Sequence, residues 1–257
     1  MAVVQDIFEY INSFAPVETK AQWDNCGILV GDREQFVRRA LVSLDITNEV
    51  VAEAKKIGAQ LIISHHPVIF NPVSSVTSES VVYELISNNI SAVCMHTNLD
   101  LAEDCGVNIC LANSLLLDNI ALLDGEFIAT GDTKEEYYPV DFAYFVKRKL
   151  NCNGLRYTEP DPNKTIKKVA VSSGSGGESF LKAAELGCDA LVTGEIKHHE
   201  ILQANAHGIC IFDVGHFKSE DVVVGALCEK LNAHFNLKNV SFLKSQTFSD
   251  KIKYCAE

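Results

Sequence analysis

Histidines and carboxylates follow three apolar runs of this sequence. The run "LIIS" ends in two adjacent histidines and a proline, and two later runs each end in a histidine with a carboxylate four residues further on. That spacing places both side chains on one face of a helix. Mixed imidazole and carboxylate donors suit zinc, iron, manganese or similar divalent ions. The candidate residues are His65, His66, His96, Asp100, His216 and Glu220.

The two adjacent histidines, His65 and His66, stand immediately before Pro67. Inside a strand their side chains would point to opposite faces, but at a strand end the chain turns and both rings can converge on one cavity. Proline ends further strand pairing at this point. Because buried polar groups need partners, a metal-ligand role is favoured over a purely structural one. Such a pair suits two neighbouring ions, with one imidazole to each.

The two carboxylates also have simpler interpretations. Glu220 lies in the first turn of the expected helix 219–235, where an acidic residue complements the helix dipole. Asp100 has a similar alternative role as a cap before the next helical stretch. Together with three of the four candidate histidines, however, two carboxylates make five ligands, more than the roughly three protein ligands of an open catalytic zinc site. The set suits two ions about 3.5–4 Å apart that share a carboxylate and lower the pKa of a water.

Strand-like and helix-like segments alternate through the first hundred residues. Asn48 is the candidate N-cap of the first of these helices and Gly58 its C-terminal stop. Strands separated by single helices are typical of a mostly parallel α/β sheet, where functional groups gather beyond the carboxyl ends of the strands. The expected strands are 40–46, 59–64 and 90–96, and the expected helices are 48–58 and 78–89.

The pattern recurs later in the chain. The segment 42–66 aligns without a gap on 171–195, and the paired histidines then meet Gly194 and Glu195. With a slightly different offset, His96 and Asp100 meet His216 and Glu220, so that His96 is the expected counterpart of His216. A generic likeness of β-α-β units is the alternative. We favour an internal duplication, because the histidine and the carboxylate recur four residues apart at both strand ends.

The predicted fold is therefore α/β, with two related α/β halves from an internal duplication and a metal site at strand carboxyl ends between them. Since His216 and Glu220 must join a site built by the first half, the first domain is expected to comprise 1–125 and 212–257. The second domain is expected to be 126–211. The polar loop that contains Pro160 and Pro162 is the candidate linker or surface excursion.

Composition excludes several classes of protein. The net charge of −12 argues against a surface for nucleic acid or anionic membranes. No stretch approaches the roughly 18 apolar residues of a membrane span, and the amphipathic N-terminal stretch is unlike a signal peptide, so a cytoplasmic location is expected. Nine cysteines at scattered spacings argue against a disulfide framework or a zinc ribbon and fit small core residues.

Several motifs together resemble a known family. "WDNCGILVGD", "ISHHPVIF", "HTNLD", "GSGGES", "TGEIKHHE" and "DVGHFKSE" are similar to those of the GTP cyclohydrolase 1 type 2 family, also called NIF-three-like dinuclear metal-centre proteins. The resemblance covers nearly the whole chain, which lacks the extra middle domain of some members. It implies two similar α/β halves and a homohexameric ring whose metal sites face an internal cavity. The metal ligands that it implies are His65, His66, Asp100, His216 and Glu220, with Glu220 as the bridging carboxylate.

Two functions follow as hypotheses. The first is a hydrolase with two divalent metal ions (iron, zinc or manganese) that acts on a nucleotide or another phosphorylated small molecule; the family name implies the purine ring of GTP. The second is a non-enzymatic metal carrier, storage protein or regulatory scaffold, which would need the same ligands. A catalytic site also needs a proton-transfer group. His96 is the candidate for that catalytic role or for a supporting role behind the ligands, and a satisfied core histidine is the alternative.

The sequence assigns no definite role to three further features. The glycine-rich turn "SSGSGGES" suits ordinary tight-turn packing better than an anion site. Glu195, His198 and His199 either line the substrate cavity or, for the two histidines, belong to a solvated helix face. Asp24 and Asn25 are polar residues before an apolar strand, and spacing alone gives them no chemistry.

Overall fold

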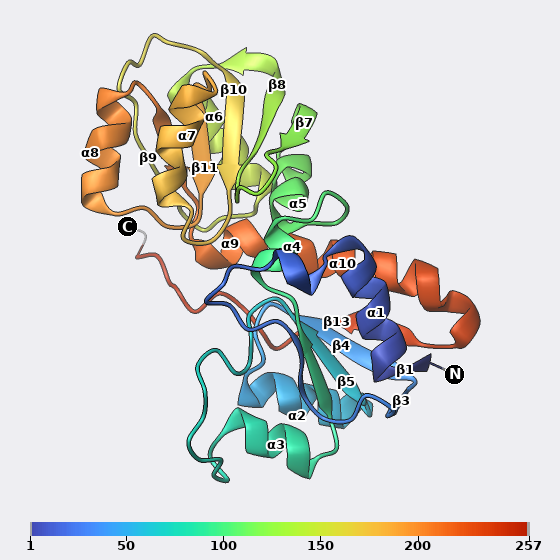
Figure 1. Ribbon diagram of the computed structural model, residues 1–257. Coiled ribbons are helices and arrows are strands. Elements are labelled where there is room, and N and C mark those ends of the chain that lie inside the picture. The colour runs from blue at the N-terminus through green and yellow to red at the C-terminus, as the bar shows by residue number, and fades with distance from the viewer. Residues whose placement is uncertain (1, 256–257) are drawn as a thin grey trace. The chain divides into compact units, whose positions relative to one another are not determined.

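The computed structural model describes residues 2–255, which form two compact units (Figure 1). The first unit runs to Gly106 and returns with Val223–Ser249. The second unit comprises Val107–Val222 and the segment from Asp250 onward. A later segment thus completes the first unit, but it begins only at Val223, and His216 and Glu220, which the predicted first domain included, lie in the second unit.

The boundaries differ from the predicted ones because two strands pair within the second sheet. Strand β7 (Asp118–Leu122) hydrogen-bonds to β8 (Ala129–Tyr137), and β12 (Cys210–Asp213) hydrogen-bonds to β11 (Ala190–Thr193). The second unit therefore begins before residue 126 and extends beyond residue 211. It also includes the loop with Pro160 and Pro162, which joins two strands of one sheet and is exposed at residues 161–164. Of the two interpretations, the surface excursion therefore fits and the linker between units does not.

The first unit is built on a five-stranded sheet. Four neighbouring strands are parallel, and the fifth, β2, pairs antiparallel with β6 at one edge. A separate two-stranded pair joins β1 (Ala2–Val3) to β3 (Phe36–Val37). In sheet order the five strands are β13 (Ser241–Lys244), β4 (Arg39–Ser43), β5 (Leu61–Ser64), β6 (Ser91–Cys94) and β2 (Gly27–Val30).

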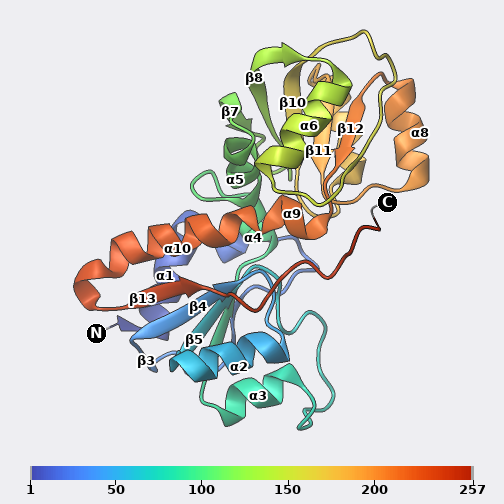
Figure 2. The same ribbon diagram turned by 180° about the vertical axis from the view of Figure 1, so that it is seen from behind.

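Helices cover both faces of this sheet (Figures 1 and 2). Helices α2 (Asn48–Ile57) and α3 (Val81–Ser87) pack on one face, where Leu41, Ile62 and Ala92 are buried. On the other face lie α1 (Val4–Phe14) and α10 (Val222–Phe235), the former being the amphipathic helix predicted at the N-terminus. Three short helices complete the unit: η1 (Val17–Thr19), α4 (Thr97–Asp100) and η3 (Asn236–Lys238).

The ends of α2 follow the predicted chemistry with one change. The N-cap is Thr47, not Asn48, because the Thr47 hydroxyl accepts a hydrogen bond from the Val50 backbone N–H. Gly58 ends the helix in the left-handed conformation, at φ +65°, as expected of a C-terminal glycine.

The second unit has a six-stranded sheet with helices on both faces. Strands β10, β11 and β12 are parallel in the middle, and β7, β8 and β9 are antiparallel at the two sides. Helices α5 and α6 share one core with this sheet, and α7 and α8 share the other. The remaining bounds are β9 (Arg156–Tyr157), β10 (Ile166–Ser172), α5 (Val107–Ser114), α6 (Pro139–Lys149), η2 (Gly177–Ser179), α7 (Phe180–Glu185), α8 (His198–Ala206) and α9 (His216–Glu220).

The two units repeat one strand register, which agrees with the predicted internal duplication. Strand β4 pairs with β5 through Ser43 and Ser64, and β10 pairs with β11 through Ser172 and Thr193, the positions that the sequence alignment equates. The third strand shows a shift of one residue. Cys94 of β6 corresponds to Asp213 of β12.

This register corrects the expected equivalence of two histidines. Two residues beyond Cys94 and Asp213 lie His96 and Gly215, which are the N-cap residues of α4 and α9. His216 therefore takes the position of Thr97, one residue later than predicted. The shared four-residue spacing does not make His96 and His216 equivalent.

Within residues 2–255, no helix has both the length and the apolar character needed to span a membrane. Most cysteines are core residues, as predicted. The buried ones are Cys94, Cys110, Cys152, Cys188, Cys210 and Cys228.

The segment after β13 is fixed to α2 by one carboxylate, which allows a stability prediction. Glu53 accepts hydrogen bonds from the Ser245 and Thr247 hydroxyls at 2.6 and 2.8 Å and from the Gln246 backbone N–H at 2.9 Å. Burial opposes the charged form, but these hydrogen bonds outweigh it and lower the pKa of Glu53. We expect Glu53→Gln to reduce the free energy of unfolding by about 1 kcal/mol at neutral pH.

The difference in the free energy of unfolding between the wild type and Glu53→Gln depends on pH, because folding lowers the pKa of Glu53. A carboxyl whose pKa is lowered on folding stabilises the protein above its unfolded pKa, here 4.5, and this stabilisation is lost as the pH falls through the folded value. Urea unfolding of the wild type and of Glu53→Gln, at neutral pH and below pH 4, measures this stabilisation. The exposed Glu79→Gln serves as control, and an equal effect of both substitutions at neutral pH would contradict the prediction.

Candidate metal centre

Three imidazoles converge at the carboxyl edge of the first sheet. His65 and His66 directly follow β5, and His96 follows β6, the parallel neighbour of β5. One ligand nitrogen of each ring lies within 4.8 Å of the others. The ring centroids are 5.0 to 5.5 Å apart. His65 is buried and the other two are partly buried, so the sequence prediction that adjacent strand ends would gather these histidines is confirmed.

Each of these rings is held at Nδ1 by an oxygen acceptor. The Nδ1 of His65 lies 3.0 Å from the Met95 carbonyl oxygen. The Nδ1 atoms of His66 and His96 each lie 2.9 Å from a carboxylate oxygen, of Asp45 and Asp24 respectively. An acceptor at Nδ1 assigns the proton to that nitrogen and the lone pair to Nε2. Metal-ligating histidines are oriented in the same way, so the arrangement fits a bound cation.

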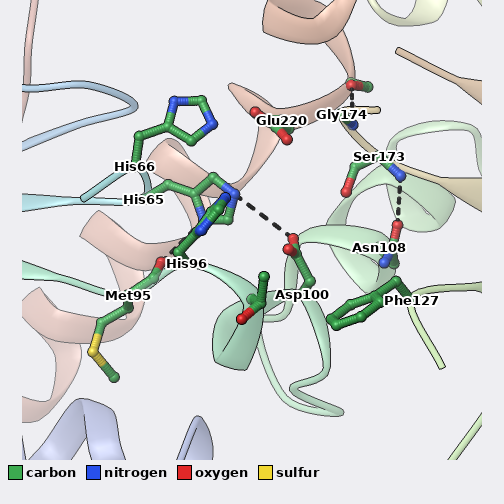
Figure 3. A network of polar contacts seen from close by, with 12 residues as sticks. His65, His66, Met95, His96, Asp100, Asn108, Phe127, Ser173, Gly174 and Glu220 are labelled. Atoms are coloured by element: carbon green, nitrogen blue, oxygen red, sulfur yellow. Dashed lines mark hydrogen bonds and ion pairs between the residues drawn. The ribbon is translucent and has the colours of Figure 1, made fainter. Parts of the chain in front are cut away.

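Asp100 completes the first unit's donor set. It is the last residue of α4, and its Oδ1 lies 3.7 Å from Nε2 of His65 (Figure 3). His96, four residues earlier, is the N-cap residue of α4 and faces Asp24. The spacing therefore places Asp100 near the imidazole group, but it is His65 that Asp100 approaches.

The Asp24 carboxylate sets the electrostatics around His96. Its Oδ2 accepts hydrogen bonds from the Thr97 backbone N–H and hydroxyl and from the Cys26 thiol. Burial favours the neutral acid, but these hydrogen bonds and the one from His96 outweigh it and hold the pKa of Asp24 well below its usual range. Burial also raises the pKa of the Cys26 thiol to about 12, so this thiol stays protonated.

His96 itself is kept neutral. Burial and the nearby His65 lower the pKa of His96, against the opposing influence of Asp24. A neutral imidazole with its lone pair on Nε2 can accept a proton or ligate a cation. The structure thus places His96 with the candidate ligands and not in the apolar core.

A second donor pair lies on α9 of the second unit. His216 and Glu220 are the first and last residues of this helix, and Nε2 of His216 is 3.0 Å from Oε2 of Glu220. The prediction that four-residue spacing places both on one helix face is confirmed. Glu220, however, ends α9 and does not lie in the first turn of a helix 219–235, because α10 begins only at Val222.

His216 is also held at Nδ1 by a carboxylate. The Oε1 of Glu195, which follows β11, lies 3.3 Å from that nitrogen, and the Ser175 hydroxyl donates to the other oxygen of Glu195 at 2.7 Å. Glu195 therefore lies beside the candidate ligand His216. His198 and His199 are exposed on α8, which favours the solvated helix face among the two interpretations left open.

The glycine-rich turn packs against α9. Gly174 donates its N–H to the Ser219 hydroxyl at 2.9 Å, and Ser173 donates to the Asn108 side chain at 2.9 Å (Figure 3). At Gly174 φ is +57°, and a Cβ would lie 2.3 Å from Oε1 of Glu220. Close backbone approach explains the glycine, as the tight-turn interpretation expected.

Sequence reasoning missed Asp45 and left Asp24 open. Asp45 lies two residues after Ser43 of β4, and His66 lies two residues after Ser64 of β5. Because Ser43 pairs with Ser64, Asp45 and His66 hold equivalent positions beyond neighbouring strands. An acidic residue in register with a histidine at the neighbouring strand end is a signal that could have identified it. No comparable local signal marks Asp24, which reaches His96 from a turn 72 residues earlier.

Comparison with known proteins gives one consistent result. The family model described as Duf34/NIF3 (NGG1p interacting factor 3) matches residues 2–251. A "GTP cyclohydrolase 1 type 2 homolog" of Clostridium perfringens is 32% identical over 262 residues, which cover 98% of this chain and 99% of the relative.

Solved structures that match this chain are consistent with the family-model match. The crystal structure of a Staphylococcus aureus hypothetical protein matches 98% of this chain and 99% of its own, with a TM-score of 0.92 and 30% identity. A Bacillus cereus protein related to NIF3 shares the fold, with a TM-score of 0.92, 23% identity and 99% coverage of both chains. By its sequence and its fold, the chain belongs to the Duf34/NIF3 family.

Proposed function

We propose that the protein is a metal-dependent hydrolase with two divalent cations, and that its ligands are His65, His66, Asp100, His216 and Glu220. The observation that carries this proposal is the orientation of the imidazoles. His65 and His66 each direct Nδ1 to an oxygen acceptor, which turns Nε2 toward the proposed ions. His216 lies between two carboxylates, with Nδ1 3.3 Å from Glu195 and Nε2 3.0 Å from the proposed co-ligand Glu220.

The donor chemistry and the relatives define the reaction class. Imidazole and carboxylate donors suit iron, zinc or manganese. Two such ions would polarise an electrophilic substrate and lower the pKa of a water. A nucleotide-like substrate is proposed because curated relatives that are 32% identical to this chain are named GTP cyclohydrolase 1 type 2 homologs. By the same family resemblance, we propose assembly as a homohexamer.

His96 is proposed to move the proton that hydrolysis requires. Its neutral Nε2 accepts a proton, and the Asp24 carboxylate at Nδ1 then stabilises the imidazolium cation. Asp24 also fixes the orientation of the ring, because Thr97 holds the carboxylate in place with two hydrogen bonds. The same group returns the proton to the leaving group.

Metal counting and turnover of purified protein test this function. We expect two ions per chain after reconstitution with iron, zinc or manganese, and hydrolysis of GTP or a related phosphorylated compound. Replacing His96 by alanine should reduce turnover by about 10²- to 10⁴-fold, the range for a general acid–base group, with the ion count unchanged. The exposed His198→Ala is the control.

The alternative role as a metal carrier or scaffold predicts a different result. It requires the same two ions but no turnover by the metal-loaded wild type, and no selective effect of His96→Ala. Fewer than two ions per chain would contradict the dinuclear centre itself. A loss of metal in His96→Ala would instead make this residue a ligand and overturn its assignment to proton transfer.

A further inference from the structure

Two large aromatic side chains are exposed beside His96 in the first unit. Trp23 is 62% exposed and Phe70 is 47% exposed, although both are strongly apolar. Their ring centroids are 5.8 Å apart. Each ring also lies near His96, at 6.0 and 6.3 Å between centroids, in an edge-to-face arrangement.

The backbone around these aromatics is fixed. The Asn25 side chain donates a hydrogen bond to the Ile69 carbonyl at 2.6 Å, which joins the turn of Trp23 to the segment of Phe70. The Ala21 backbone N–H donates to the Thr97 hydroxyl at 2.9 Å. Asp24, next to Trp23, is buried against His96 and Thr97. The backbone that carries the two rings is therefore held in place before any ligand binds, which lowers the entropic cost of binding.

The positive charges near Trp23 and Phe70 indicate which class of ligand these rings can bind. The Lys20 ammonium donates to the Asp24 carbonyl at 2.7 Å and places a positive charge on the same turn. A cationic ligand would meet this ammonium as well as the cations of the proposed centre, so cation–π recognition is disfavoured. A neutral or anionic planar ring stacks on such faces without that repulsion.

We propose that Trp23 and Phe70 form an aromatic platform that binds a planar heteroaromatic ring, such as a purine, of the substrate beside His96. This inference rests on the proposed function and specifies its substrate class. The platform orients the ring beside the imidazole of His96. Neither aromatic has a place in the chemistry of the centre, so both are positioning and specificity residues.

The chain contains a single tryptophan, and its fluorescence therefore reports on the platform directly. We expect guanosine to quench the emission of Trp23 in the metal-loaded protein, whereas ribose phosphate, which has no ring to stack, leaves it unchanged. Phe70→Ala should weaken guanosine binding roughly tenfold, as expected for the loss of one stacking partner. The control Phe36→Ala removes another exposed phenylalanine of the same unit, 61% exposed, and should bind guanosine like the wild type.

Three results would overturn the platform: no quenching by guanosine, equal quenching by ribose phosphate, or equal effects of Phe70→Ala and Phe36→Ala. If Phe70→Ala instead dissociates an oligomer and guanosine does not bind, the aromatics cover a subunit contact. The ion count and turnover on the same preparations separate the two proposals. Two ions and turnover without guanosine binding would reject only the platform, and guanosine binding without metal or turnover would reject only the hydrolase.

Discussion

Replacing His65 by alanine is expected to weaken binding of divalent cations at least about 100-fold and to leave fewer than two ions per chain. His65 is buried, and its ring is fixed between the Met95 carbonyl and the Asp100 carboxylate. Mutation of a group that merely orients a ligand costs about 10- to 100-fold in metal affinity, so loss of a ligand should cost at least as much. Metal analysis after dialysis and competition with a chromophoric chelator measure the change.

Stability measurements separate metal binding from folding in this experiment. A cation at 100 times its dissociation constant stabilises the folded state by about 2.7 kcal/mol per site. The melting temperature of the wild type should therefore rise with added metal, and that of His65→Ala should rise much less. His65→Gln keeps more of the side-chain volume in case the alanine variant folds poorly. The exposed His199→Ala should respond like the wild type, and a wild-type ion count in both His65 variants would remove His65 from the proposed ligands.

The parts of the centre that sequence could predict are local ones. His216 and Glu220 share a helix face because four residues make about one helical turn, whichever partners that helix has. His65, His66 and His96 come together because their parallel strands are neighbours, which the alternation of strands and helices already indicated. Both inferences need only the nearest elements of the chain.

The parts that could not be predicted depend on distant pairing. Asp24 reaches His96 across 72 residues, from a turn that has no regular pattern of its own. The unit boundaries depend on β7 and β12, whose membership in the second sheet follows from hydrogen bonds to β8 and β11. His216 corresponds to Thr97 and not to His96 because the connection before β12 differs in length from the connection before β6. Only the pairing of the strands shows by how many residues.

Replacing Gly174 by alanine is expected to lower metal affinity by about 10- to 100-fold through displacement of Glu220, the range for a perturbed ligand environment. A Cβ at this position would lie 2.3 Å from Oε1 of Glu220. The carboxylate is the end of a flexible side chain and can turn aside, so the fold should persist while the ligand geometry is lost. The metal affinity of the purified variant is the quantity to measure.

The chain offers a matched control for the backbone strain in this experiment. Gly187 has φ +68°, close to the +57° of Gly174, but nothing lies within 4 Å of its Cβ position. Alanine in the left-handed conformation costs about 1–2 kcal/mol, so both variants should lose similar stability, while only Gly174→Ala should lose metal affinity. On a Glu220→Ala background, Gly174→Ala should cause no further loss, because the displaced group is absent. Equal metal affinity of the Gly174 and Gly187 variants would show that the carboxylate of Glu220 is not a ligand.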